Sequence, residues 1–297
     1  MPSKRPCVVG LGEILWDMLP SGTFLGGAPA NFAFHANELG AHGVVVSAVG
    51  QDDLGQRIVD QLQQLNVSTA GLRQTTQPTG TVTVTTVAGQ PNYVIHTDVA
   101  WDFIPFDTAL RDLASQTDAV CFGTLAQRCH NSRESIRSFL QATGKHCWRI
   151  FDINLRQQFY DASVIRSSLE LAHVLKLNHE ELPIVAQLMG INATAEETIQ
   201  ILLQSCQLRL IALTRGGSGS SLYTRWRTSH HPGYPVSNIA DTVGAGDSFT
   251  AALVMGLLNS DDLDSIHDRA ARIASYVCTQ RGATPQLPDE LRSRTRK

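Results

Sequence analysis

The 297-residue sequence lacks several features that would point directly to a class of function. No apolar run approaches the roughly 18 residues of a transmembrane helix, and the N-terminus is a poor signal peptide. The six cysteines form no CxxC pair, so neither a zinc site nor a disulfide framework is expected. Lys and Arg total 24 against 27 Asp and Glu, a net charge of −3 without the basic excess of a nucleic-acid binder. We therefore expect a cytoplasmic protein with reduced thiols and with neither membrane nor nucleic acid as partner.

Common nucleotide-binding and hydrolase motifs are also missing. The chain has no G-x-x-x-x-G-K-[ST] sequence and no H-E-x-x-H sequence. Residues 10–15 (GLGEIL) fail the dinucleotide-binding pattern because Leu15 stands at the third glycine, and residues 216–220 (GGSGS) miss the nucleophile elbow at Ser220. A P-loop protein is thereby excluded.

What the sequence does contain is a regular alternation of short β-rich runs with helical segments. Hydrophobic residues make up 42% of the chain, enough for a large core. The alternation predicts an α/β fold with a mostly parallel central sheet flanked by helices, and such sheets bind ligands at the carboxyl ends of their strands. The expected strands are 44–49, 118–122, 147–152, 174–177 and 208–214, and the expected helices are 54–65, 132–143, 161–172, 194–204 and 245–258.

One segment breaks this alternation. Residues 80–87 alternate Thr with Val, and residues 92–96 follow after a glycine-containing connection. This pattern predicts a hairpin with one polar and one apolar face, inserted between helices of the α/β unit. Its apolar face needs a substrate or a second subunit to cover. The alternative is an edge hairpin packed on its own domain.

Residues 241–247 (DTVGAGD) precede an apolar helical pattern and are the most informative stretch. Gly244 and Gly246 permit a tight turn whose N–H groups converge with the positive end of the helix on one point, which predicts an anion site. Asp247 in the first turn stays ionised at neutral pH beside that anion. It can therefore act as a general base toward a substrate hydroxyl, with the amides holding transition-state charge. The alternative is that Asp247 merely caps its helix.

A second glycine cluster lies at residues 26–31 (GGAPAN). Gly26 and Gly27 allow the backbone to approach a ligand closely, and Pro29 suits the first turn of a helix. Asn31 offers both a donor and an acceptor, which suits a polyol. The alternative is a plain strand–turn–helix junction.

Together, residues 26–31 and 241–247 resemble the two signatures of the ribokinase-like carbohydrate kinases, the phosphofructokinase-B family, in order and separation. The resemblance covers essentially the whole chain. It implies a single ribokinase-like domain over residues 1–297, with a small inserted β lid formed by about 13–25 and 79–103. It further implies an ATP-dependent sugar kinase that uses Mg²⁺.

The resemblance carries over to individual positions. The base would be Asp247, with the amides of Gly244, Ala245 and Gly246 around the transferring phosphoryl group. The substrate-binding residues would be Asp17, Gly26, Gly27, Asn31 and Arg156. The ATP neighbours would be Asn178, Glu181, Thr214, Gly216, Gly219 and Gly246, with Glu181 reaching magnesium through water. A monovalent cation, K⁺, would lie at Asp241, Val243 and Gly282.

Three further stretches resemble bacterial fructokinases: residues 100–102 (AWD), 122–128 (FGTLAQR) and 152–156 (DINLR). They favour phosphorylation of fructose to fructose 6-phosphate. Ribose, 2-keto-3-deoxygluconate, another sugar acid or a nucleoside remain alternative substrates, and residues 275–278 offer no polar reader of adenine. A non-catalytic sugar-binding protein is a rival class, which the intact 244–247 turn argues against. The lid is also a candidate homodimer interface.

Overall fold

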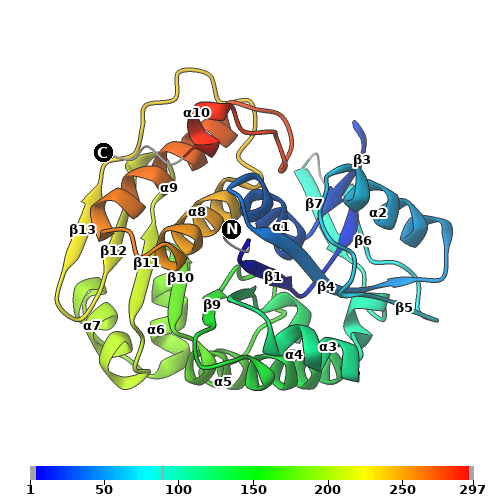
Figure 1. The fold of residues 1–297 in the computed structure, drawn as a ribbon, viewed down its shortest axis with the longest axis horizontal. Coiled ribbons are helices and arrows are strands. Elements are labelled where there is room, and N and C mark those ends of the chain that lie inside the picture. Colours follow the sequence, from blue (N-terminus) through cyan, green and yellow to red (C-terminus); the bar gives the residue numbers. More distant parts are fainter. Residues whose placement is uncertain (1–4, 88–89, 294–297) are drawn as a thin grey trace.

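A nine-stranded sheet with the order β13-β12-β11-β10-β9-β8-β1-β4-β5 forms the centre of the computed structural model, which describes residues 5–87 and 90–293 (Figure 1). The strands from β11 to β5 run parallel, and only β12 and β13 join antiparallel to their neighbours. The predicted mostly parallel sheet is thus confirmed. Its strands are β1 (Cys7–Leu11), β4 (His42–Gly50), β5 (Leu72–Thr75), β8 (Ala119–Phe122), β9 (Trp148–Asp152), β10 (Val174–Asn178), β11 (Leu210–Thr214), β12 (Ser220–Tyr223) and β13 (Thr228–His231).

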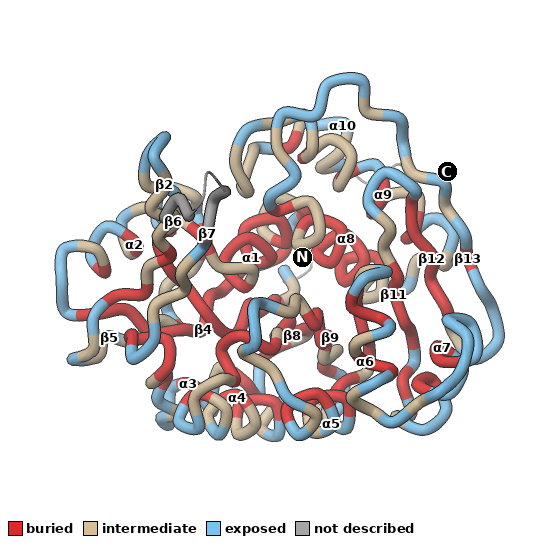
Figure 2. Tube along the Cα trace, turned by 180° about the vertical axis from the view of Figure 1, so that it is seen from behind, coloured by how far each residue is buried: buried red, intermediate tan, exposed pale blue. Residues whose placement is uncertain are grey.

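Helices cover both faces of this sheet (Figure 1). Since successive strand residues point to opposite faces, Val8 of β1 packs in the core beneath α1, α8 and α9, and Val9 in the core facing α3 to α7. Figure 2 shows buried residues following the strands, with the outer surfaces exposed. The helices are α1 (Ala28–Glu38), α2 (Asp53–Gln64), α3 (Thr108–Ser115), α4 (His130–Ala142), α5 (Ala162–Leu171), α6 (Glu181–Met189), α7 (Ala195–Ser205), α8 (Ala245–Leu258), α9 (Leu263–Cys278) and α10 (Asp289–Arg292).

A separate four-stranded sheet has the order β3-β2-β6-β7. The predicted hairpin is present as β6 (Thr81–Val87) and β7 (Gln90–Ile95), while residues 88–89 of its connection lie outside the described residues. β6 runs parallel to β2 (Leu15–Leu19), which pairs with β3 (Gly22–Gly26). Two segments far apart in the sequence therefore build this small sheet.

Two further observations concern the cysteines and the length of the helices. The six cysteines, all within the described residues, form no disulfide. Within residues 5–87 and 90–293, no helix combines the length and apolar character needed to cross a bilayer.

Candidate active site

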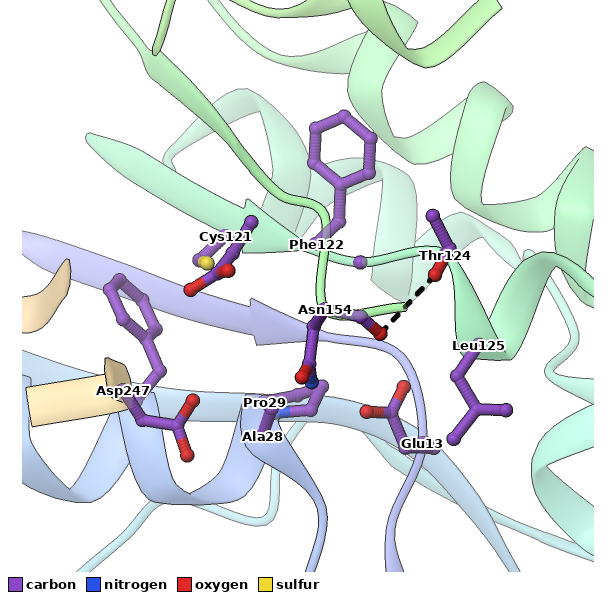
Figure 3. A pocket seen from close by; sticks show the side chains of 12 residues that line it. Glu13, Ala28, Pro29, Cys121, Phe122, Thr124, Leu125, Asn154 and Asp247 are labelled. Atoms are coloured by element: carbon purple, nitrogen blue, oxygen red, sulfur yellow. Dashed lines mark hydrogen bonds between the residues drawn. The ribbon is translucent and has the colours of Figure 1, made fainter. Parts of the chain in front are cut away.

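The carboxyl ends of the central strands meet at one edge of the large sheet, and a pocket opens there (Figure 3). Its lining combines residues that follow β1, β8 and β9 with the first turns of α1 and α8. The parallel register explains this meeting, because neighbouring parallel strands end at the same edge. The lining residues are Glu13, Ala28, Pro29, Phe32, Cys121, Phe122, Gly123, Thr124, Leu125, Asp152, Asn154 and Asp247.

The turn before α8 requires glycine at one position for conformation and at another for space. Gly244 is the residue before the helix and has a left-handed backbone, with φ of 79°. A Cβ there would also lie 2.4 Å from the Ala283 carbonyl oxygen. Gly246 lies inside the helix, where a Cβ would approach Lys176 Nζ to 3.1 Å. The expectation that both glycines shape the turn thus needs correction: Gly244 shapes it, and Gly246 leaves room for a lysine.

Asp247 lies in the first turn of α8 and lines the pocket. Asn31 Nδ2 donates a hydrogen bond to Asp247 Oδ2 at 2.8 Å, so the two predicted signatures meet directly. Burial, reinforced by the nearby Asp152 charge, raises the pKa of Asp247 to about 6, and the group remains mostly ionised at neutral pH. No side chain in the described residues caps α8, so the capping alternative for Asp247 is wrong.

The structure adds a buried charge network that the sequence interpretation missed. Lys176 Nζ, inside β10, donates to Asp152 Oδ1 at 2.9 Å, and Thr250 Oγ1 donates to Asp152 Oδ2 at 3.0 Å. Burial alone would lower the pKa of Lys176, but Asp152 and Glu181 raise it. The ammonium thus stays charged behind the first turn of α8. A lysine between leucines in a predicted core strand was the signal that could have revealed it.

Glu13, directly after β1, is the second residue that was missed as a site residue. Its side chain is buried and lines the pocket with Asp247 (Figure 3). Burial raises the pKa of Glu13 to about 7, the Asp247 charge acts in the same direction, and Arg156 opposes it. Glu13 and Asp247, two of the three carboxyl groups that line the pocket, thus both have raised pKa values.

The predicted substrate-binding residues surround this pocket rather than line it. Gly27 begins α1 with φ of 114°, and a Cβ there would lie 2.5 Å from the Glu13 carbonyl oxygen. A Cβ on Gly26 would lie within 2.4 Å of Asp17 Oδ2 in the paired strand. Burial raises the pKa of Asp17, and the exposed Arg156 lowers it. Asp17, in β2 of the small sheet, and Arg156, after β9 of the large sheet, are thus close enough for their charges to interact, and neither lines the pocket.

The residues predicted to face ATP form a second group at the same edge. Asn178 and Thr214 are paired neighbours at the ends of β10 and β11. Glu181 Oε1 accepts from the Leu155 amide at 2.9 Å and Oε2 from the Asn178 amide at 2.8 Å. Each oxygen keeps a further lone pair, which fits an outer-sphere contact with hydrated Mg²⁺ better than a direct bond. Across residues 5–87 and 90–293, no cluster of three or more metal-ligating side chains occurs.

The glycines of the following turn differ in their surroundings. Gly216 has φ of 54°, and a Cβ there would meet no atom within 4 Å, so the space beside it is open. Gly219 has φ of 85°, and a Cβ would lie 2.1 Å from the His231 carbonyl oxygen. Packing between β12 and β13 therefore accounts for Gly219 without a ligand.

Asp241 joins the two loops that were expected to hold a monovalent cation. Its Oδ1 accepts from the Val243 amide at 3.0 Å and its Oδ2 from the Gly282 amide at 3.2 Å. His35 Nε2 bonds the neighbouring Ala283 carbonyl at 2.9 Å from α1. Burial lowers the pKa of His35 to about 4, so the ring is neutral and Nε2 carries the donated proton.

Two of the three stretches that resemble fructokinases, residues 100–102 and 122–128, are joined by an internal ion pair. Arg128 donates to both oxygens of Asp102 at 2.8 Å, and both side chains are nearly fully buried. The Arg128 guanidinium also lies 3.9 Å from the ring centre of Trp101. These residues hold the segment after the small sheet against α4. Asp102 and Arg128 are therefore paired with each other inside the protein.

The fold, with its pocket at the carboxyl edge of the large sheet, is that of a ribokinase-like kinase. The profile of the pfkB family of carbohydrate kinases matches residues 22–290, and the chain belongs to that family.

Individual relatives agree with this assignment. An uncharacterized sugar kinase of Pyrococcus horikoshii is 30% identical over 277 residues, covering 90% of this chain and 84% of the relative. Its structure in complex with ATP has a TM-score of 0.80, with 27% identity and coverage of 94% and 93%. Fructokinase-2 of Oryza sativa is 26% identical over 311 residues, covering 95% of this chain and 90% of the relative. The ATP-bound fructokinase of Xylella fastidiosa has a TM-score of 0.84 at 23% identity and covers 96% of each chain, which supports the fold.

Proposed function

We propose that this carbohydrate kinase transfers the γ-phosphoryl group of ATP to fructose, forming fructose 6-phosphate. The observation that carries the proposal is Asp247, an ionised carboxylate at the N-terminus of α8 inside a pocket at the carboxyl edge of the sheet. The relatives from Pyrococcus horikoshii and Oryza sativa support ATP and fructose respectively. Kinases of ribose, 2-keto-3-deoxygluconate or a nucleoside remain the alternatives.

The geometry supports a simple transfer step. The sugar hydroxyl oxygen bonds to the γ-phosphorus, its proton passes to Asp247, and the bond to the leaving ADP oxygen breaks. The first N–H groups of a helix lack a carbonyl partner four residues earlier, so they and the helix dipole can hold phosphoryl charge. The Ala245 N–H contributes less, because it donates to the Thr242 carbonyl at 3.4 Å. Asn31 fixes the orientation of the Asp247 carboxylate. Magnesium, carried on the ATP phosphates, would neutralise charge there, with Asn178 and Glu181 in its outer shell.

We expect fructose to give the highest kcat/KM in a panel that also contains ribose, 2-keto-3-deoxygluconate and a nucleoside. A pocket built for given hydroxyls discriminates by orders of magnitude, because a missing hydroxyl leaves buried polar groups unpaired. Coupled ADP release measures the rates, and mass spectrometry identifies the phosphorylated product. A higher kcat/KM for any other member would contradict the fructose assignment.

A monovalent cation is expected to tune the rate. Asp241 links the turn before α8 to the Gly282 loop, and carbonyl oxygens of Val243 and the Gly282 loop would complete a cage suited to weakly hydrated K⁺. A fructokinase of Vibrio cholerae has been crystallised with fructose, ADP and potassium. Replacing K⁺ by Na⁺ and then by a bulky organic cation, at constant ionic strength, should lower kcat stepwise. Equal rates with all three cations, together with an unchanged rate for Asp241→Asn, would contradict a role for the cation. Asp241 would then only connect the two loops through its hydrogen bonds.

The proposed lid and dimer rest on the small sheet. Its surface carries Phe24 and Tyr93, which are 46% and 54% exposed. We propose that residues 13–25 and 79–103 cover the bound sugar. The surface of the small sheet around Phe24 and Tyr93 is the candidate dimer interface. Comparing the sedimentation of the wild type with that of a Tyr93→Lys variant would test it.

A further inference from the structure

Glu13 holds a buried oxygen that nothing in the protein satisfies. The residue is 3% exposed, and its Oε2 has no hydrogen-bond partner within the described part of the chain. The side chain nevertheless lines the pocket that contains Asp247. Because buried polar atoms are costly when unpaired, this oxygen is suited to a group that enters with a ligand.

The charges around Glu13 determine which form of the carboxyl is present. Asp247 faces it from α8, and Asp152 and the Cys121 thiol line the same pocket from β9 and β8. Arg156, exposed beyond the end of β9, supplies the opposing charge. The buried Lys176 is already committed to Asp152 at 2.9 Å. A negatively charged Glu13 would thus share a small space with two other carboxylates, and its pKa is raised to about 7 mainly by burial.

We propose that Glu13 is a substrate-binding residue that, as a neutral carboxylic acid, donates a hydrogen bond to a sugar oxygen near the hydroxyl attacked through Asp247. This inference rests on the proposed function. It specifies the substrate class further: an uncharged polyol suits this position better than an anion, because a carboxylate or phosphate placed there would lie among Glu13, Asp152 and Asp247. Glu13 would donate a hydrogen bond while Asp247 accepts a proton. Other enzyme sites also contain two carboxyl groups whose different environments give them different roles.

The first test is the pH dependence of kcat/KM between pH 5 and 9 with the best sugar. The wild type should rise as Asp247 ionises near pH 6 and fall as Glu13 ionises above about 7, reaching a roughly thirty-fold loss by pH 8.5 at tenfold per pH unit. Glu13→Gln offers an amide donor at every pH, so its alkaline fall should shrink to less than about threefold. Glu13→Ala should raise KM about tenfold with a much smaller change in kcat, as expected for one lost hydrogen bond.

Glu134→Gln provides the matched control, since Glu134 is exposed on α4 and is not among the residues that line the pocket. It should reproduce the wild-type profile. An alkaline fall in Glu13→Gln equal to that of the wild type would overturn the inference, as would an unchanged KM in Glu13→Ala.

A second readout separates this inference from the proposed function. Infrared difference spectra of wild type and Glu13→Gln without sugar should reveal a protonated carboxyl band that disappears on titration through about pH 7. If no sugar in the panel is phosphorylated, the proposed function fails, and this band still decides the protonation of Glu13. A spectrum without the band at pH 6 overturns the inference even when fructose is turned over.

Discussion

Asp247→Asn should lower kcat by about 10²–10⁴-fold, the range typical of a positioned acid or base. The amide cannot take up the hydroxyl proton, although its oxygen can still accept the bond from Asn31 Nδ2. ATP affinity, measured by titration calorimetry, should change by no more than a few-fold. Steady-state ADP release with the best sugar gives kcat.

The pH profile sharpens this prediction. Since burial raises the pKa of Asp247 to about 6, wild-type kcat should climb as pH rises from 5 to 7, and the residual rate of Asp247→Asn should lack that climb. Asp112→Asn, an exposed carboxylate on α3, is the control and should match the wild type. Turnover of Asp247→Asn within a few-fold of the wild type would show that another group accepts the proton.

Lys176→Met should cost about 3–5 kcal/mol of unfolding free energy, because it leaves Asp152 charged and buried without its partner. Loss of the ammonium should also raise the pKa of Asp247, since Lys176 is among the groups that lower it. Urea unfolding measures the first effect. The second appears as a shift of the rising limb of kcat toward higher pH.

The exposed pair of Arg227 and Asp264 supplies a matched comparison. Arg227→Met should cost no more than about 1 kcal/mol, because solvent screens an exposed ion pair. Adding Asp152→Leu to Lys176→Met should recover stability. It should also move the rising limb of kcat back toward lower pH, because the Asp152 charge that raises the pKa of Asp247 is then lost as well. Equal losses for Lys176→Met and Arg227→Met would contradict the importance of the buried pair.

The elements that the sequence predicted are those whose patterns are local. Helix 245–258 coincides with α8, and the expected strands at 44–49 and 174–177 lie within β4 and β10, because strands buried on both faces read as continuous apolar runs. The alternating Thr and Val of 80–87 likewise specified β6. The hairpin of β12 and β13 was missed, since SSLY and TSHH lack such a pattern.

The site was only partly predictable for a related reason. Asp247 and Asn31 lie in the two glycine-rich signatures, whereas Glu13, in the loop after β1, and Lys176, inside β10, lie outside them. Their importance comes from burial and from neighbours contributed by other elements, such as Asp152 beside Lys176. Arg128 is a further case, because its buried ion pair with Asp102 joins two segments and leaves no local pattern in the sequence.

One face of α1 has a consequence for how the protein is made. Asn31 and His35, one helical turn apart, bond Asp247 and Ala283, partners that follow 216 and 248 residues later in the chain. At a synthesis rate of about 5–20 residues per second, a ribosome needs on the order of ten seconds or more to deliver those partners. Until then, the α1 face of the sheet lacks α8 and α9, and its apolar residues stay open to chaperones. Such long-range closure also slows folding, so the kinase should acquire activity only when its last quarter has docked.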